Sequence, residues 1–291
     1  MPSLKEIKNR IQSVRSTRKI TSAMMMISSS KLRKIQKIIE NLYPYQQKLH
    51  QLMELFVNSQ NDFISPFAQQ QPIKRVAIVA FSSNTSLAGR FNDNVINELK
   101  SIVNTYLYLG KENIEIYAIG DKVGEAARKM GFETLNNFRQ IADKPSYEAT
   151  QQLASDLMDM FLKKKFDKVE LIYHHYKSKS SQELVCETFL PITLNTDEDK
   201  WNVPEFDYIV EPDPQTIMNQ LIPKTLRLKL YTAHADSVSS EHAARTIAMQ
   251  TATDNADDLL DELTLQYNKL RQQSITNELL DIIGGSFGRE G

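Results

Sequence analysis

The segment Ser3–Tyr43, which reads SLKEIKNRIQSVRSTRKITSAMMMISSSKLRKIQKIIENLY, contains neither glycine nor proline. After Pro44 a second run without these residues continues to Ser65, and a third extends from Lys224 to Ile283. Glycine and proline are the residues that most often interrupt helices, so these stretches predict two long helices. A helix of about 60 residues would be about 90 Å long. Because one small globule cannot bury such a helix, each needs a helical partner.

The apolar residues of both ends recur at alternating spacings of three and four residues, which is the heptad signature of a coiled coil. The N-terminal seam consists of Leu4, Ile7, Ile11, Val14, Met25, Leu32, Ile35, Ile39, Leu42, Leu49, Met53 and Phe56, interrupted by Arg18, Thr21, Ser28 and Gln46. The C-terminal seam consists of Met249, Ala252, Ala256, Leu259, Leu263, Leu270 and Leu280, interrupted by Gln266, Gln273 and Asn277. The simplest closure is one antiparallel two-helix coiled coil that the chain forms with itself.

The charges of the two ends support this pairing. The 291 residues carry a formal net charge of -1, with 41% apolar and 24% charged residues. Residues 1–40 hold ten Lys and Arg against two Glu, whereas residues 236–291 hold four Lys and Arg against ten Asp and Glu. Opposite charges favour the approach of the two ends to each other or to different partners. The near-neutral total gives no reason to expect binding to nucleic acid.

The middle of the chain has a different pattern, in which apolar β-rich runs alternate with helical stretches. Strands are expected at 75–81, 114–119, 169–173 and 183–189, with a fifth at Asp207–Val210, and helices at 91–108, 121–130 and 147–164. This alternation predicts an α/β (Rossmann-like) domain of about five strands in a largely parallel sheet. The chain then divides into an N-terminal shaft helix at 1–65, an α/β domain at 70–210 and a C-terminal shaft helix at 211–291.

We find no motif for chemistry in the α/β domain. It has neither the phosphate-binding G-x-x-x-x-G-K-[ST] nor G-x-G-x-x-G, and Gly120 and Gly124 are expected to serve a turn and helix packing. His174 and His175 are adjacent on a strand, so they point to opposite faces and cannot share a metal. Cys186 is the single cysteine, which excludes an intrachain disulfide, and it is expected in the core. We therefore expect no catalytic, cofactor or metal site.

Clusters on the predicted helices favour protein contacts. The acidic group Asp257, Asp258, Asp261 and Glu262 is typical of a solvated helix face. The basic group Lys31, Arg33, Lys34 and Lys37 lacks interleaved aromatic residues, so a protein partner is favoured over nucleic acid. The run Met24–Met26 covers about 300° of a helix, so at least one methionine must face away from the seam. An outward methionine on a long helix indicates a surrounding protein sleeve, although adaptable packing in the seam is the alternative.

Four stretches resemble the gamma subunits of F-type ATP synthases. They are Leu4–Met24, Ser240–Ala256, Leu265–Leu279 and Ile282–Gly285, with Leu171–Ser178 and Gln182 similar to the family's central strand. Ser240–Ala256, which reads SEHAARTIAMQTATDNA, is the most specific of them. The chain departs from the family in the loop Ser83–Asn92, at Thr246 and in the tail Ser286–Gly291.

The resemblance implies a rotor shaft that is not itself catalytic and has no cofactor. In this family the coiled coil stands inside a ring of alternating alpha and beta subunits, which hold the nucleotides. The α/β domain, with an epsilon subunit, sits on the membrane ring of c subunits. The chain is then expected as a single copy, without homo-oligomers or nucleic acid, on the cytoplasmic face of a bacterial inner membrane, where rotation couples proton flow to ATP synthesis or hydrolysis.

The resemblance also implies which residues meet the partners. The expected contact residues are Arg10, Arg15, Arg18, Lys19, Met24, Lys31, Arg33, Arg245, Gln250, Arg271, Gln272, Thr276 and Glu278. Arg271 and Gln272 match a pair that meets a beta-subunit loop bearing Asp and Thr, and Ser274 could extend that network. Two alternatives stay open: a structural or signalling coiled coil whose α/β domain binds a ligand, and an enzyme with its site in that domain. Co-purification with alpha, beta and epsilon subunits distinguishes the rotor from both.

Overall fold

The computed structural model describes residues 3–59, 65–69, 71–134, 138–192, 211 and 213–287. Two helices dominate it: α1 spans Leu4–Ser59 and α6 spans Pro214–Phe287, with 56 and 74 residues. The chain forms two compact units, one of residues 1–28 with 246–291 and one of residues 29–245. Both predicted long helices are confirmed, and Pro44 and Pro223 lie inside them rather than at their ends.

In the unit of residues 1–28 and 246–291, α1 and α6 run in opposite directions. The Thr21 and Thr253 hydroxyls lie 2.8 Å apart, and Arg18 forms an ion pair with Asp257, so residue numbers fall along one helix as they rise along the other. Helix α1 begins with a capping box, in which the Ser3 hydroxyl accepts from the Glu6 amide at 3.2 Å and the Glu6 carboxylate accepts from the Ser3 amide at 2.8 Å. These two bonds satisfy backbone donors that a helix start otherwise leaves free.

The predicted N-terminal seam agrees with the burial of α1. Its residues Ile7, Leu32, Ile35, Ile39, Leu49 and Met53 are buried, as are Thr21 and Ser28 among its polar interruptions. Leu4, Ile11, Val14, Met25 and Leu42 are half-buried, while Arg18 is exposed. The side chain of Phe56 lies outside the described residues. The small hydroxyl residues therefore occupy seam positions instead of ending the seam.

The predicted C-terminal seam needs a correction. Met249, Ala256 and Leu263 are buried, but Leu259 and Leu280 are 37% and 60% exposed. Leu260 and Tyr267 are half-buried instead, which continues the alternating spacing from Ala256 without a break. Leu280 is exposed for another reason. Both helices rise about 1.5 Å per residue, so the pairing at Arg18 and Asp257 places the start of α1 opposite roughly residue 271 of α6.

In the unit of residues 29–245, four strands form one sheet in the order β2-β1-β3-β4. Their bounds are Val76–Phe81 for β1, Ile114–Ile119 for β2, Lys168–Tyr176 for β3 and Gln182–Leu190 for β4. Strand β1 pairs in parallel with β2 and β3, and β3 pairs antiparallel with β4. The four corresponding predictions are confirmed, and the predicted fifth strand at Asp207–Val210 lies outside the described residues.

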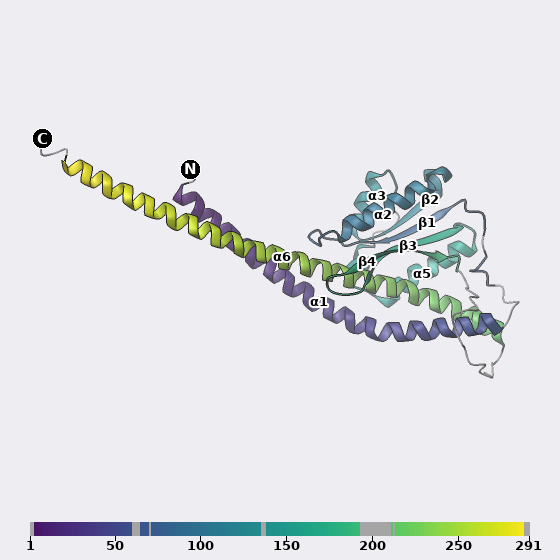
Figure 1. Cartoon of the computed structure of the whole chain (residues 1–291). Helices are drawn as coiled ribbons and strands as arrows, with labels where there is room; N and C mark the ends of the chain where they lie inside the picture. The colour runs from purple at the N-terminus through teal and green to yellow at the C-terminus, as the bar shows by residue number, and fades with distance from the viewer. Residues whose placement is uncertain are drawn as a thin grey trace. The chain divides into compact units, whose positions relative to one another are not determined.

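Helices cover both faces of this sheet (Figure 1). Helices α2 (Phe91–Tyr106) and α3 (Asp121–Lys129) pack on one face, and α5 (Tyr147–Leu162) and α6 pack on the other. Every residue of β1 is therefore buried, which explains its uninterrupted apolar sequence. Short helices not anticipated from the sequence complete the fold: α4 (Arg139–Asp143) and the 3₁₀ turns η1 (Leu107–Leu109) and η2 (Lys111–Asn113).

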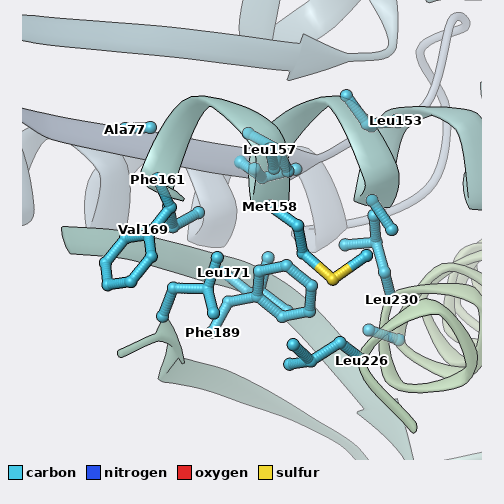
Figure 2. Packing of buried hydrophobic residues seen from close by; sticks show 14 of the residues in the cluster. Ala77, Leu153, Leu157, Met158, Phe161, Val169, Leu171, Phe189, Leu226 and Leu230 are labelled. Carbon is cyan, nitrogen blue, oxygen red and sulfur yellow. The ribbon is translucent and has the colours of Figure 1, made fainter. Parts of the chain in front are cut away.

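The larger core lies between the sheet, α5 and α6. Figure 2 shows Leu157, Met158 and Phe161 of α5 pointing toward Leu171 and Phe189 of the sheet, with Leu226 and Leu230 of α6 beside them. These side chains are among the most deeply buried of the chain. Helix α6 is thus part of the core of the α/β domain as well as a long helix, and the sheet cannot be closed on this face without it.

Three histidines are buried in the same unit of residues 29–245. His174 stacks on Phe91 with ring centroids 4.6 Å apart, and His234 stacks on Phe81 at 5.5 Å. His242 lies on α6 and is buried as well. The pKa of each of the three imidazoles is lowered from 6.5 to about 4, mainly by burial, and for His242 also by the charges of Arg245 and Lys31. The three side chains are therefore neutral in the folded chain at physiological pH.

This burial predicts an acid-sensitive fold. Between pH 6.5 and 4 the unfolded chain binds protons at these histidines while the folded chain does not, so the free energy of unfolding falls as the pH drops through that window. The upper limit is about 1.4 kcal/mol per histidine and pH unit. Urea unfolding at several pH values measures the slope. His174→Phe, which keeps an aromatic ring beside Phe91, should remove one of the three contributions. An unchanged slope in His174→Phe contradicts the assignment.

Candidate functional site

The residues predicted to contact partners are spread over both units. Those in the unit of residues 1–28 and 246–291 are Arg10, Arg15, Arg18, Lys19, Met24, Gln250, Arg271, Gln272, Thr276 and Glu278. The other unit holds Lys31, Arg33 and Arg245. All are exposed except Met24, which is half-buried, and Arg245, which is buried. They form no single cleft, so the candidate site is a set of helix surfaces.

The basic residues of α1 make the first of these surfaces. Arg10, Arg15 and Lys19 are exposed. Arg18 already pairs with Asp257 of α6, and the two side chains are 49% and 45% exposed. Exposed pairs of this kind contribute little to stability, so Arg18 can exchange Asp257 for another carboxylate at small cost. The predicted solvated face around Asp257 thus also neutralises one of the cations of α1.

Large apolar side chains lie exposed on the same stretch of α1, and sequence reasoning missed two of them. Ile20, Met26 and Ile27 are 59%, 63% and 58% exposed, and Ile247 of α6 is 43% exposed. Met26 confirms that one methionine of the Met24–Met26 run faces away from the seam. The isoleucines could have been found, because they do not fit the seam spacing. Gathered apolar exposure of this kind is typical of a protein-binding surface.

The C-terminal part of α6 makes the third surface. Arg271 is exposed and forms no ion pair with a described residue. The Thr276 hydroxyl donates to the Gln272 carbonyl at 2.9 Å, and the Ser274 hydroxyl donates to the Glu278 carboxylate at 3.3 Å. Exposed apolar residues, also missed from the sequence, accompany these polar groups at Leu265, Ile275, Leu279, Ile282 and Ile283. This surface offers a guanidinium fork among apolar side chains.

Arg245 has a different environment from the other predicted contacts. Its guanidinium donates to the buried Glu241 one turn earlier on α6, and to the Thr85 hydroxyl at 3.0 Å and the Thr85 carbonyl at 3.4 Å. Burial raises the pKa of Glu241, and the charge of Arg245 opposes that effect. Thr85 belongs to the divergent loop Ser83–Asn92, so Arg245 ties this loop to α6. The described contacts of Arg245 are therefore internal, and its partner role stays a prediction.

The α/β domain has a polar cavity at the carboxyl end of β2, where nucleotides bind in many related sheets. Its volume is about 410 Å³, and Gly120, Asp121, Arg128 and Arg139 are among its lining residues. Gly120 has φ of 105°, and an added Cβ would lie 2.2 Å from the Ser82 carbonyl oxygen, so it serves the turn. Asp121 carries a carboxylate into the first turn of α3 and pairs with Arg139 at 3.3 Å. That carboxylate repels a phosphate at the helix start.

Two further expectations concern metal and thiol chemistry. Within the described ranges, no group of three or more His, Cys, Asp or Glu side chains could hold a metal ion. Cys186 was expected in the core, and this is wrong: it is exposed on β4, which in the described part of the chain pairs only with β3. Partial shielding of its thiol, followed by the charges of Glu170 and Glu98, raises its pKa to about 11. Cys186 is therefore a weak nucleophile at neutral pH.

Comparisons with known proteins agree with this geometry. Residues 3–287 match the family model described as ATP synthase. The ATP synthase gamma chain of Phocaeicola vulgatus is 53% identical over 289 residues, covering 98% of this chain and 99% of its own length. That of Bacteroides fragilis is 54% identical with the same coverage. The chain belongs to the ATP synthase gamma-chain family. As a member, it is a non-catalytic subunit of ATP synthase.

Solved structures of this fold are more distant in sequence. The rotor of the Euglena gracilis mitochondrial ATP synthase has a TM-score of 0.61 at 17% identity, covering 94% of this chain and 98% of its own. The central stalk and c-ring structure from Tetrahymena thermophila has a chain with a TM-score of 0.57 at 19% identity, covering 80% and 99%. At this level of identity the likeness supports the arrangement of long helices around an α/β domain.

The buried pair of Glu241 and Arg245 gives a second prediction. Arg245→Leu leaves the Glu241 carboxylate buried without its cation, which should lower the free energy of unfolding by about 3–5 kcal/mol. The double substitution Glu241→Leu with Arg245→Leu removes both charges and should recover much of that loss. Urea unfolding at pH 7 measures both variants. Equal destabilisation of the single and double variants would show that the loss comes from packing rather than from an unpaired charge.

Proposed function

We propose that the chain is the central rotor shaft of an F-type ATP synthase. Its rotation couples proton flow across the membrane to ATP synthesis or hydrolysis on the ring of alpha and beta subunits. The observation that carries the proposal is the antiparallel pair of α1 and α6, whose outer surface keeps cations and large apolar side chains exposed. Exposed Ile20, Met26 and Ile27 are unfavourable on the surface of an isolated helix pair in water. A protein sleeve around the shaft would cover them.

The two units have separate roles in this proposal. The helices of residues 1–28 and 246–291 stand within the alpha and beta ring as a coiled-coil shaft. The basic residues of α1 face acidic loops of the beta subunits: Arg10, Arg15, Arg18 and Lys19 in this unit, and Lys31 and Arg33 in the unit of residues 29–245. Because each exposed charge pair is worth roughly 0–1 kcal/mol, such contacts can be made and released as the shaft turns. Asymmetry of the helix pair then presents a different surface to each beta subunit in turn.

The α/β domain is the foot of the rotor. We infer that it binds the epsilon subunit and rests on the ring of c subunits, with one copy of the chain in each complex. No helix in the described part of the chain is long and apolar enough to cross a bilayer. The chain is then held at the cytoplasmic face of a bacterial inner membrane through the c ring. The c-ring that accompanies the central stalk in the Tetrahymena structure supports the proposed contact with the c subunits.

The ligand-binding alternatives have less support. Asp121 occupies the helix start that a phosphate would need in the cavity beside Gly120, and it is already paired with Arg139. The chemistry of ATP therefore belongs to the partner subunits in this proposal. Neither a signalling coiled coil nor an enzyme explains the exposed apolar end of α6. Co-purification of the chain with alpha, beta and epsilon subunits is the direct discriminator, and a stable homodimer without them would contradict the proposal.

Arg271 gives the sharpest test of the shaft surface. A guanidinium fork binds a carboxylate through two bonds, and in the closed space of a sleeve the loss of one partner costs about 3–5 kcal/mol. We therefore expect Arg271→Leu to impair ATPase turnover and ATP synthesis. Lys269→Leu, an exposed cation two residues away on the same helix, is the matched control and should have a smaller effect.

The two variants are compared as assembled complexes of equal subunit content. ATPase rate and ATP-driven proton pumping are both measured, because the first reports turnover and the second reports coupling. Equal effects of the two substitutions, or no effect of Arg271→Leu, would show that this residue does not engage a beta subunit during rotation.

A further inference from the structure

The carboxyl end of β3 reaches both long helices in the unit of residues 29–245. The His174 carbonyl accepts a hydrogen bond from the Ser240 hydroxyl of α6 at 3.2 Å. His175 bonds through Nδ1 to the Asp236 carboxylate of α6 at 2.8 Å. The Tyr176 hydroxyl accepts from the Gln36 amide of α1 at 2.7 Å. Three consecutive residues of one strand thus bind two helices that are distant in sequence.

Asp236 is the centre of this arrangement. Its side chain is 4% exposed. The Tyr43 hydroxyl of α1 lies 2.6 and 2.7 Å from the two carboxylate oxygens, in addition to the bond from His175. The Tyr43 hydroxyl and Nδ1 of His175 also lie 3.3 Å apart. One buried carboxylate therefore accepts from α1 and from β3 while it belongs to α6. We call Tyr43, His175 and Asp236 the clasp.

Further charged and titratable groups lie near the clasp. Burial raises the pKa of Asp236, which the bonds from Tyr43 and His175 oppose. Burial, and then the bond to Asp236, raises the pKa of Tyr43, and Tyr173 of β3 adds to this effect. The exposed side of His175 is near Glu183, which pairs with Lys177. The clasp is thus a set of directed bonds to a carboxylate that is costly to leave unpaired.

We propose that the clasp locks the α/β domain to both shaft helices so that they turn together. This inference rests on the proposed rotor function and names the residues that carry the torque. Apolar contacts are non-directional, so packed surfaces such as the core beside α5 resist separation more than sliding. Hydrogen bonds weaken steeply as their angle and length change, so they oppose sliding of a strand end along a helix. If the α/β domain slipped along the helices, rotation of the domain would no longer be coupled to rotation of α1 and α6.

Tyr43→Phe tests the lock, because it removes one hydroxyl and keeps the ring. Hydrogen exchange of the full chain should show the amides around position 43 opening about tenfold faster, as expected when a bond to a charged group is lost. Tyr108→Phe, at a tyrosine of η1 that is 73% exposed, is the control and should leave exchange around position 43 unchanged. Equal exchange in the two variants would overturn the clasp as a structural lock, whatever the function of the chain.

Coupling is tested in the assembled complex with Tyr43→Phe and Asp236→Asn. The ratio of protons pumped to ATP hydrolysed should fall in both variants and stay unchanged in Tyr108→Phe. A ratio equal to wild type in a variant whose exchange is faster would overturn the torque-bearing role. A complex that assembles with the wild-type chain but does not pump would instead contradict the rotor function, so the two failures are distinguishable. If Asp236→Asn does not assemble, Tyr43→Phe alone decides.

Discussion

Helix α6 is buried on all its faces from Leu230 to Ala243, within the unit of residues 29–245. A helix enclosed in this way must satisfy every polar group inside the protein, because water cannot reach them. The segment nonetheless contains Asp236, Glu241, Thr232 and three serines beside alanines. Small side chains let the sheet approach closely. Asp236 is matched by donors from α1 and β3, and Glu241 by Arg245 of the same helix. The attachment of the α/β domain depends on this enclosed segment.

The enclosed segment of α6 and the helices of the other unit therefore differ in how their side chains find partners. In the enclosed segment, side chains find their partners within the chain, as Asp236 does with Tyr43 and His175. In the unit of residues 1–28 and 246–291, the helices bury only a narrow seam and leave Ile20, Ile27 and Leu279 exposed. A surface of this kind is unfavourable in water and is retained where another protein covers it. The chemistry of ATP needs no group on this chain, because its task is to transmit rotation between partners.

The long helices and the strands could be predicted because their signals are local. The breaker-free runs gave α1 and α6, and the apolar β-rich runs gave the four strands with bounds close to those observed. The errors came from tertiary context. Leu259 and Leu260 both suit a heptad seam, and only the register against α1 selects Leu260. Cys186 lies in an apolar strand, but its exposure is set by the position of β4 in the sheet order.

The candidate site was predicted less completely, for a related reason. Cations and the Arg271–Gln272 pair were identified by resemblance, and their exposure agrees with a contact role without testing it. The clasp could not be predicted, because Tyr43, His175 and Asp236 are far apart in the sequence and only the fold brings them together. The same holds for Thr85, which has no recognisable motif and was noted only as part of a divergent loop. Long-range polar contacts have no periodicity, so a single sequence does not reveal them.

Rotation of the α/β domain relative to the alpha and beta ring is the central claim. A bead attached through Lys179→Cys, in the turn after β3 and in a Cys186→Ser background, reports that motion in single complexes held by the ring. We predict unidirectional rotation of the bead that requires ATP and stops when ATP is removed. A bead that stays fixed while the same complexes hydrolyse ATP would contradict it.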